Sequence, residues 1–253
     1  MKKIICALLL ATGAIFVSCN KEESKGNLTV TGNVDGFKQG KLYLYQIQDT
    51  VVKAIDSLTV NGDSKFKFSL NIDSPEVFYL TLDRGHTNSQ DNQIMFFAEP
   101  GQMTINTSLK NFYSDAKVTG SKSQETYDEY IKTRSIIVEK QNNLLVDIFN
   151  AEKEKNDSKK DSLVNLSKKL TIRKYLNAVN FAINHKESDA SPYIALTELY
   201  DANTKLLDTV FNSLSKDVTA RKYGKQFNEY IKERKTQEAQ VKTEQVPTAE
   251  VQQ

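Results

Sequence analysis

Cysteine, histidine and tryptophan are scarce in this sequence of 253 residues, which limits the chemistry that the chain can perform. It contains two cysteines, two histidines and no tryptophan. Cys6 lies in an apolar N-terminal run, so removal of that run would leave one cysteine and no internal disulfide. Stability must then come from a packed core, and we expect neither a metal site nor a cofactor.

An excess of charge of either sign is also missing. The chain has 34 Lys and Arg against 32 Asp and Glu, and this near balance gives no electrostatic footprint for nucleic acid. No second apolar run is long enough to cross a bilayer. The composition therefore indicates a globular body of one large or two modest domains that does not bind nucleic acid.

The N-terminus has the pattern of an export signal. Two lysines precede an apolar run at residues 4–17, which is too short to span a membrane but matches the core of a signal peptide. The run ends in Phe-Val-Ser-Cys at residues 16–19, which resembles the lipobox of bacterial lipoproteins, although Phe16 stands where Leu is usual. The resemblance implies that residues 1–18 are removed and that Cys19 is lipidated, which anchors the protein to a membrane. A plain signal or a membrane anchor with an incidental cysteine is the alternative.

Residues 19–26 form a polar tether behind this cysteine. Lys21-Glu22-Glu23 resembles the signal that sends lipoproteins of Bacteroidetes-type bacteria to the outer face of the outer membrane. A tether that is merely soluble is the alternative. We expect a lipid-anchored protein of the cell envelope, in the outer membrane, with its surface exposure left open.

Residues 27–120 have the period of β-strands. Apolar and polar residues alternate at 28–34, 41–45 and 65–70, and five further strands are predicted at 51–60, 77–82, 93–97, 103–107 and 116–119. Asn61-Gly62 stands between two such runs and is a strong hairpin signal. About eight short strands separated by turn residues predict an antiparallel β-sandwich.

Residues 121–235 have the period of helices, so the predicted fold class is α+β. Apolar residues recur at threes and fours in two long segments joined by a polar stretch at 152–161, which predicts an antiparallel helical hairpin. Ser121 and Gln124 are spaced as a capping box at its start. Ser191-Pro192 marks a further helix start, and shorter helices follow. Residues 236–253 are polar, and we expect a disordered tail.

Several short motifs follow one another in a familiar order. They are Gly32, Gly40-Lys-Leu-Tyr-Leu44, Asp56 to Gly62, Phe66-Lys-Phe68, Pro75, Phe78-Tyr-Leu80, Phe97-Ala-Glu-Pro-Gly101 and Val118-Thr-Gly-Ser121, then Ser191-Pro-Tyr-Ile194 and Tyr223-Gly-Lys-Gln226. This order resembles the domain of unknown function 4369 (DUF4369), together with the linker that leads from it into thioredoxin-like (AhpC/TSA-type) domains of Bacteroidetes lipoproteins. The resemblance covers most of residues 27–235.

The family's thioredoxin domain is expected to be missing from this chain, which ends where that domain would begin. Thiol–disulfide exchange needs a reactive thiolate and a resolving thiol. A mature chain with a single lipidated cysteine has neither, so we expect no such activity from it. An accessory role beside a separate redox or stress-response protein remains an alternative.

One polar loop, at residues 83–92, contains the candidate ligand-binding side chains Asp83, His86 and Asp91. Their spacing matches no known calcium or zinc site, and a solvated connection between strands is the alternative. His185 falls at the end of the second long helix, where a histidine suits the helix C-terminus. We find no catalytic set of nucleophile, acid and base.

A group of aromatic residues in the strands suggests either a sugar-binding platform or core and cross-strand packing. These residues are Tyr43, Tyr45, Phe66, Phe68, Phe78, Tyr79, Phe96 and Phe97.

The sequence thus predicts a non-catalytic, membrane-tethered protein that binds an envelope ligand or a partner protein through its sandwich loops or its helical hairpin. Glycan or small-ligand binding through the 83–92 loop is the further alternative.

Overall fold

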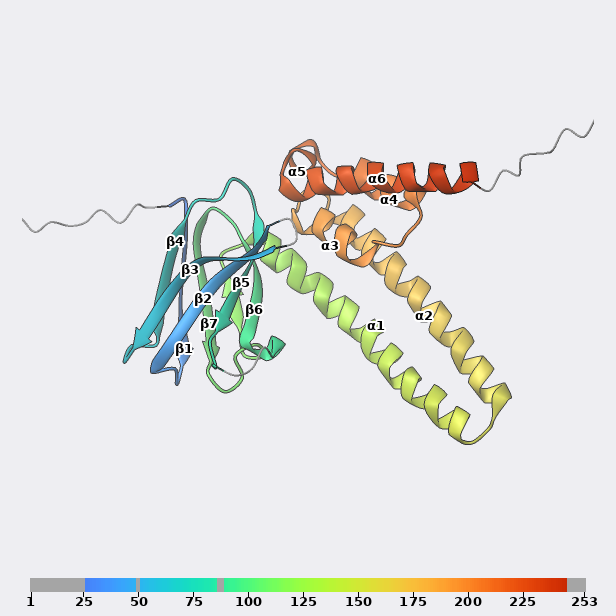
Figure 1. The fold of residues 1–253 in the computed structure, drawn as a ribbon, viewed down its shortest axis with the longest axis horizontal. Helices are drawn as coiled ribbons and strands as arrows, with labels where there is room; N and C mark the ends of the chain where they lie inside the picture. Colours follow the sequence, from blue (N-terminus) through green and yellow to red (C-terminus); the bar gives the residue numbers. More distant parts are fainter. Residues whose placement is uncertain (1–25, 49–50, 86–88, 245–253) are drawn as a thin grey trace, which may run out of the picture.

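The computed structural model describes residues 26–48, 51–85 and 89–244, and this part of the chain forms two β-sheets followed by helices (Figure 1). The predicted α+β class, a β-sandwich of eight strands with a helical region behind it, is confirmed. The strands are β1 (Leu28–Asp35), β2 (Gln39–Gln48), β3 (Val51–Asn61), β4 (Lys65–Leu70), β5 (Glu76–Leu82), β6 (Gln93–Ala98), β7 (Gly101–Ser108) and β8 (Lys117–Thr119). The helices are α1 (Lys122–Lys153), α2 (Asp157–Asn184), α3 (Ala190–Glu198), α4 (Thr204–Ser213), α5 (Lys216–Ala220) and α6 (Lys222–Glu244).

The strands form two four-stranded sheets. Sheet A has the order β4-β1-β7-β8, and sheet B has the order β3-β2-β5-β6. The described pairings are antiparallel except that of β1 with β7, which is parallel. Alternation in the sequence shows which side chains face the core but not which strands are neighbours, so it did not predict this parallel pair.

The hairpin predicted at Asn61-Gly62 is wrong. Gly62 has a φ of +95°, as a tight turn there requires, and its amide donates to the carbonyl of Lys38 at 2.7 Å. However, β3 before the turn belongs to sheet B, and β4 after it pairs with β1 in sheet A. The turn is therefore a corner between the sheets, because turn residues fix a local reversal and not the partner of the next strand.

Sheet B packs against other elements on its inner face and on part of its outer face. Its inner face meets sheet A in one hydrophobic cluster, to which Leu42 and Leu44 of β2 contribute. Its outer face carries Val77 of β5 and Phe97 of β6, which belong to a second cluster to which helices α1 to α6 all contribute. The Phe97 ring lies 5.2 Å from that of Tyr193 and 5.9 Å from that of Tyr223. The two cores thus share sheet B as a common layer.

The start of α1 is tied to the edge of sheet B. As the capping box predicts, the Ser121 hydroxyl accepts the amide of Gln124 at 3.0 Å. The reciprocal bond is not made: the Gln124 Oε1 accepts the buried amide of Phe97 at 2.7 Å, and its Nε2 donates to Asp128 at 2.7 Å. Phe97 lies on an edge strand, so its amide needs a partner from outside the sheet.

The helices α1 and α2 form the predicted hairpin, which extends away from the sandwich (Figure 1). Tyr130, Ile137, Leu144 and Ala151 are buried along α1 at intervals of seven residues. The predicted apolar stripe is wider than this seam. Some of its members are exposed by 46–61%, namely Leu145, Phe149, Leu166 and Leu176. Two helices alone bury only the seam between them, which explains these exposed side chains.

The last helix is longer than expected. The sequence predicted a disordered tail from residue 236, but α6 continues to Glu244. Residues 236–244 contain no Gly or Pro and are rich in helix-forming Gln, Glu, Lys and Ala. Contacts to α4 add support, since the Thr204 hydroxyl donates to Glu238 at 2.9 Å and Lys235 pairs with Asp208 at 2.7 Å. The rest of the expected tail, and the signal with Cys19, lie outside the described residues.

Within residues 26–48, 51–85 and 89–244, no helix is long and apolar enough to cross a membrane.

Candidate functional site

The predicted ligand loop joins β5 to β6 and contains a short 3₁₀ turn at Gln90–Asn92. Asp83 accepts the amide of Gly85 at 2.8 Å, which closes a local turn. Asp91 interacts with Ser89, whose hydroxyl lies 3.3 Å from the carboxylate. His86 lies outside the described residues. In the described part of the chain, no group of three or more His, Cys, Asp or Glu side chains is placed to hold a metal ion.

A pocket of about 520 Å³ lies on the outer face of sheet B beside this loop, and we call it the outer-face pocket. Adjacent strands provide its floor, because Tyr43 of β2 pairs with Thr81 of β5, and Thr81 pairs with Gln93 of β6. Side chains at paired positions of adjacent strands point to the same face of a sheet. Asp83 lines this pocket, whereas Asp91 does not. Of the three predicted residues, the structure thus places Asp83 in this pocket.

The outer-face pocket combines aromatic rings with polar groups. The rings of Tyr43 and Tyr45 lie nearly parallel, with centroids 5.6 Å apart and an interplanar angle of 25°. Partial burial, with Tyr43 and Asp83 nearby, raises the pKa of the Tyr45 phenol. The Thr81 hydroxyl is buried and has no hydrogen-bond partner among the described residues. An unpaired buried hydroxyl is costly, and a bound ligand is one way to satisfy it.

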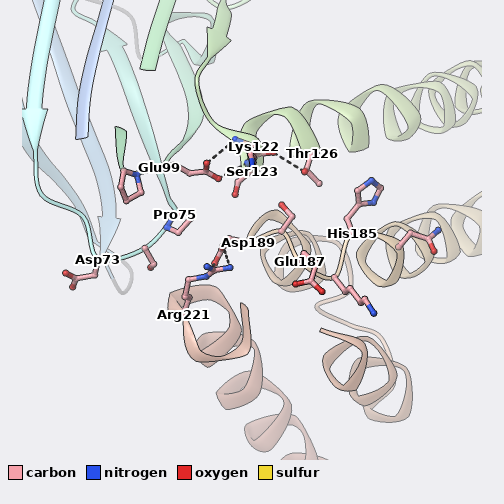
Figure 2. A pocket seen from close by; sticks show the side chains of 15 residues that line it. Asp73, Pro75, Glu99, Lys122, Ser123, Thr126, His185, Glu187, Asp189 and Arg221 are labelled. Carbon is pink, nitrogen blue, oxygen red and sulfur yellow. Dashed lines mark hydrogen bonds and ion pairs between the residues drawn. The ribbon is translucent and has the colours of Figure 1, made fainter. Parts of the chain in front are cut away.

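A larger pocket, of about 690 Å³, lies where the sandwich meets the helices, and we call it the junction pocket (Figure 2). The loop before β5, the turn after β6 and the start of α1 line one side of it. The segment between α2 and α3 and Arg221, just before α6, line the other. Sequence reasoning missed this pocket because its residues are distant in the chain and share no motif.

An ion pair between Asp189 and Arg221 anchors the helical side of the junction pocket. Asp189 is buried, and its two carboxylate oxygens lie 3.0 Å and 2.9 Å from the Nε and Nη2 of Arg221. Burial raises the pKa of Asp189 to about 6, although the Arg221 charge and hydrogen bond oppose the rise. This aspartate precedes Ser191-Pro192, where sequence reasoning saw only a helix start.

Two other titratable side chains that line the junction pocket, Glu99 and His185, are also held by the fold (Figure 2). Glu99 accepts the backbone amides of Lys122 and Ser123 at 3.0 Å and 2.8 Å, which neutralises the start of α1. His185 stacks on Phe181 with 4.0 Å between ring centroids, and its Nε2 lies 3.4 Å from Glu129. The interactions of these side chains are structural: Glu99 fixes the turn after β6 to α1, and His185 connects the end of α2 to α1. Neither side chain forms a nucleophile–base pair with a described neighbour.

The fold and its pockets define a class of protein: a two-sheet sandwich continued by a helical arm, with a ligand-sized pocket on an open sheet face. Residues 28–127 match the family model of the Domain of unknown function (DUF4369), so the resemblance seen in the sequence is confirmed for this part of the chain. The match covers the sandwich and the first turns of α1, and the remaining helices lie beyond it. No curated protein matches the chain.

Proposed function

We propose that the protein is an exported lipoprotein, anchored by lipid on Cys19 to the outer membrane, which binds an envelope ligand without transforming it. The signal-like residues 1–18 and the cysteine after them support export and anchoring. The described fold begins at Gly26, so only a short polar tether separates it from the anchor.

The outer-face pocket is the observation that carries the binding proposal. It has the volume of a small-molecule site and contains an unpaired buried hydroxyl at Thr81. The carboxylate that lines it, on Asp83, already accepts a backbone amide. A pocket with recognition groups but no paired nucleophile and base suits binding better than catalysis.

Labelling cells with radioactive palmitate tests the anchor. We expect the wild type and Cys6→Ser to take up label, because Cys6 lies in the segment that is removed. Cys19→Ser should take up none and should remain unprocessed. Label on the Cys19→Ser variant would refute lipidation at this residue.

Partnership with a separate thioredoxin-like protein is the second candidate function, and the DUF4369 match of residues 28–127 favours it. Co-purification of such a protein with the wild type from solubilised membranes would support this role. Its repeated absence from such preparations would exclude it.

A further inference from the structure

We infer that the outer-face pocket is a carbohydrate site, which takes a neutral sugar ring of an envelope or extracellular glycan. This inference rests on the proposed binding function and names the ligand class and the residues that recognise it. A sugar ring has an apolar C–H face and a rim of hydroxyl groups, and each hydroxyl both donates and accepts hydrogen bonds. A site for it needs aromatic surface and mixed polar groups in one place.

The aromatic surface comes from Tyr43 and Tyr45. These residues alternate with Leu42 and Leu44, which are buried in the inner core, so the tyrosines stand on the outer face of sheet B. Both are half-buried, and both line the pocket. Tyrosine rings held on a strand need little further ordering when a ligand stacks on them, because two side-chain torsions define each ring.

The polar rim surrounds Thr81. Its hydroxyl has no partner among the described residues, and it lies on the strand next to Tyr43 at the paired position. Asp83, Ser89 and Gln93, whose side chains carry a carboxylate, a hydroxyl and an amide, line the same pocket. Together they provide donors and acceptors, as the hydroxyl groups of a sugar require.

The balance of charge at the pocket favours a neutral ligand. Asp83 and Arg84 both line it, and their opposite charges favour neither an anion nor a cation. Arg84 already donates to the backbone carbonyl of Leu109. The larger junction pocket is a weaker candidate for the sugar site, because its carboxylates already have partners. The buried Asp189 pairs with Arg221, and Glu99 accepts a backbone amide at the start of α1.

Isothermal titration with a panel of neutral hexasaccharides tests the inference. The panel contains malto-, cello-, laminari-, manno- and chito-oligosaccharides, and the protein is residues 20–253 purified without lipid. We expect at least one to bind and Tyr43→Ala to weaken its binding roughly fivefold to tenfold, since one aromatic contact is lost. The matched control is Tyr200→Ala, because the Tyr200 side chain is 61% exposed and lies outside the pocket.

The Thr81→Val variant distinguishes an effect on sugar affinity from an effect on the stability of the fold. Valine has nearly the shape of threonine, and here it removes a hydroxyl without a described partner, so the midpoint of urea unfolding should stay the same or rise. Affinity for the sugar should nevertheless fall roughly tenfold.

The outcomes distinguish the two proposals. Sugar binding that Thr81→Val and Tyr43→Ala leave intact would overturn this site. If no hexasaccharide binds but solubilised envelope material still shifts the tyrosine fluorescence of the wild type, the carbohydrate inference fails and the binding function stands. If neither binds, both fail.

Discussion

Gly62 and Gly120 show how differently two glycines with positive φ contribute to one fold. Their φ angles are +95° and +94°. A Cβ on Gly62 would meet nothing within 4 Å, whereas one on Gly120 would lie 2.3 Å from the carbonyl oxygen of Gln102. Gly120 therefore allows the chain to pass close to β7 before α1 begins.

Alanine at these two positions should separate backbone strain from steric clash. Gly62→Ala should lower the free energy of unfolding by about 1 kcal/mol, the usual cost of a left-handed conformation. Gly120→Ala should cost about 3 kcal/mol or more, because a backbone atom must also move. Urea unfolding followed by circular dichroism measures both, and equal costs would contradict the close approach at Gly120.

The buried carboxyl of Asp189 should give the protein a distinct pH dependence. Its pKa in the folded state is about 6, above the value of about 3.9 for an aspartate in an unfolded chain. Between these values the folded state binds more protons than the unfolded state, so this group's contribution to stability falls as pH rises from about 4 to about 6. The loss is on the order of 2 kcal/mol.

Comparison with Asp189→Asn isolates this group from the other carboxylates. We measure the free energy of unfolding of both proteins in urea. We expect that of the wild type, relative to that of the variant, to fall between about pH 4 and about pH 7. A difference that is independent of pH would show that Asp189 titrates normally.

At the scale of elements, the sequence patterns predicted where the strands and the helical hairpin lie in the chain. They did not predict which strands pair or which residues connect one element to another. Alternation located the strands, and the three–four period located the helical hairpin. The parallel pairing of β1 with β7 and the corner at Gly62 could not be predicted, because both depend on which strands meet in space. Gln124 was read as a capping residue, yet its carbonyl oxygen satisfies Phe97 on a strand edge.

The seam of the helical hairpin offers a matched pair of adjacent leucines. Leu144 is 6% exposed between α1 and α2, and Leu145 is 59% exposed. Leu144→Ala should destabilise the protein by about 2–3 kcal/mol, because it leaves a cavity in the seam. Leu145→Ala should change stability by less than about 0.5 kcal/mol. Thermal unfolding of both variants checks this, and a similar loss for each would mean that Leu145 is covered in solution.

At the scale of the whole molecule, sheet B couples the sandwich to the helices. Phe96 lies in the inner core and its neighbour Phe97 in the outer one, so consecutive residues of β6 serve both clusters. Sequence reasoning interpreted the strand aromatics either as a sugar-binding platform or as core and cross-strand packing, but alternation could not show that helices cover part of the outer face. The uncovered part of that face is where the outer-face pocket lies. Only Asp83 of its lining was predicted as a ligand-binding residue, while Tyr43 and Tyr45 were placed in a wider aromatic group.

This shared layer predicts that the protein unfolds as one unit. Helix content, followed by circular dichroism, and tyrosine fluorescence should change at the same urea concentration. Phe97→Ala should lower the free energy of unfolding by about 3–5 kcal/mol and keep the two transitions together. Two separate transitions in the wild type would show that the sandwich and the helices are independent.

The central claim is that the open face of sheet B recognises a ligand. Magnetisation transfer between a bound hexasaccharide and the tyrosine rings tests this claim most directly. Intermolecular nuclear Overhauser effects measured by NMR should join sugar ring protons to Tyr43 and Tyr45, and at the same sugar concentration they should be weaker in Thr81→Val. Effects that instead join the sugar to His185 or Arg221 would place the ligand in the junction pocket and contradict the account.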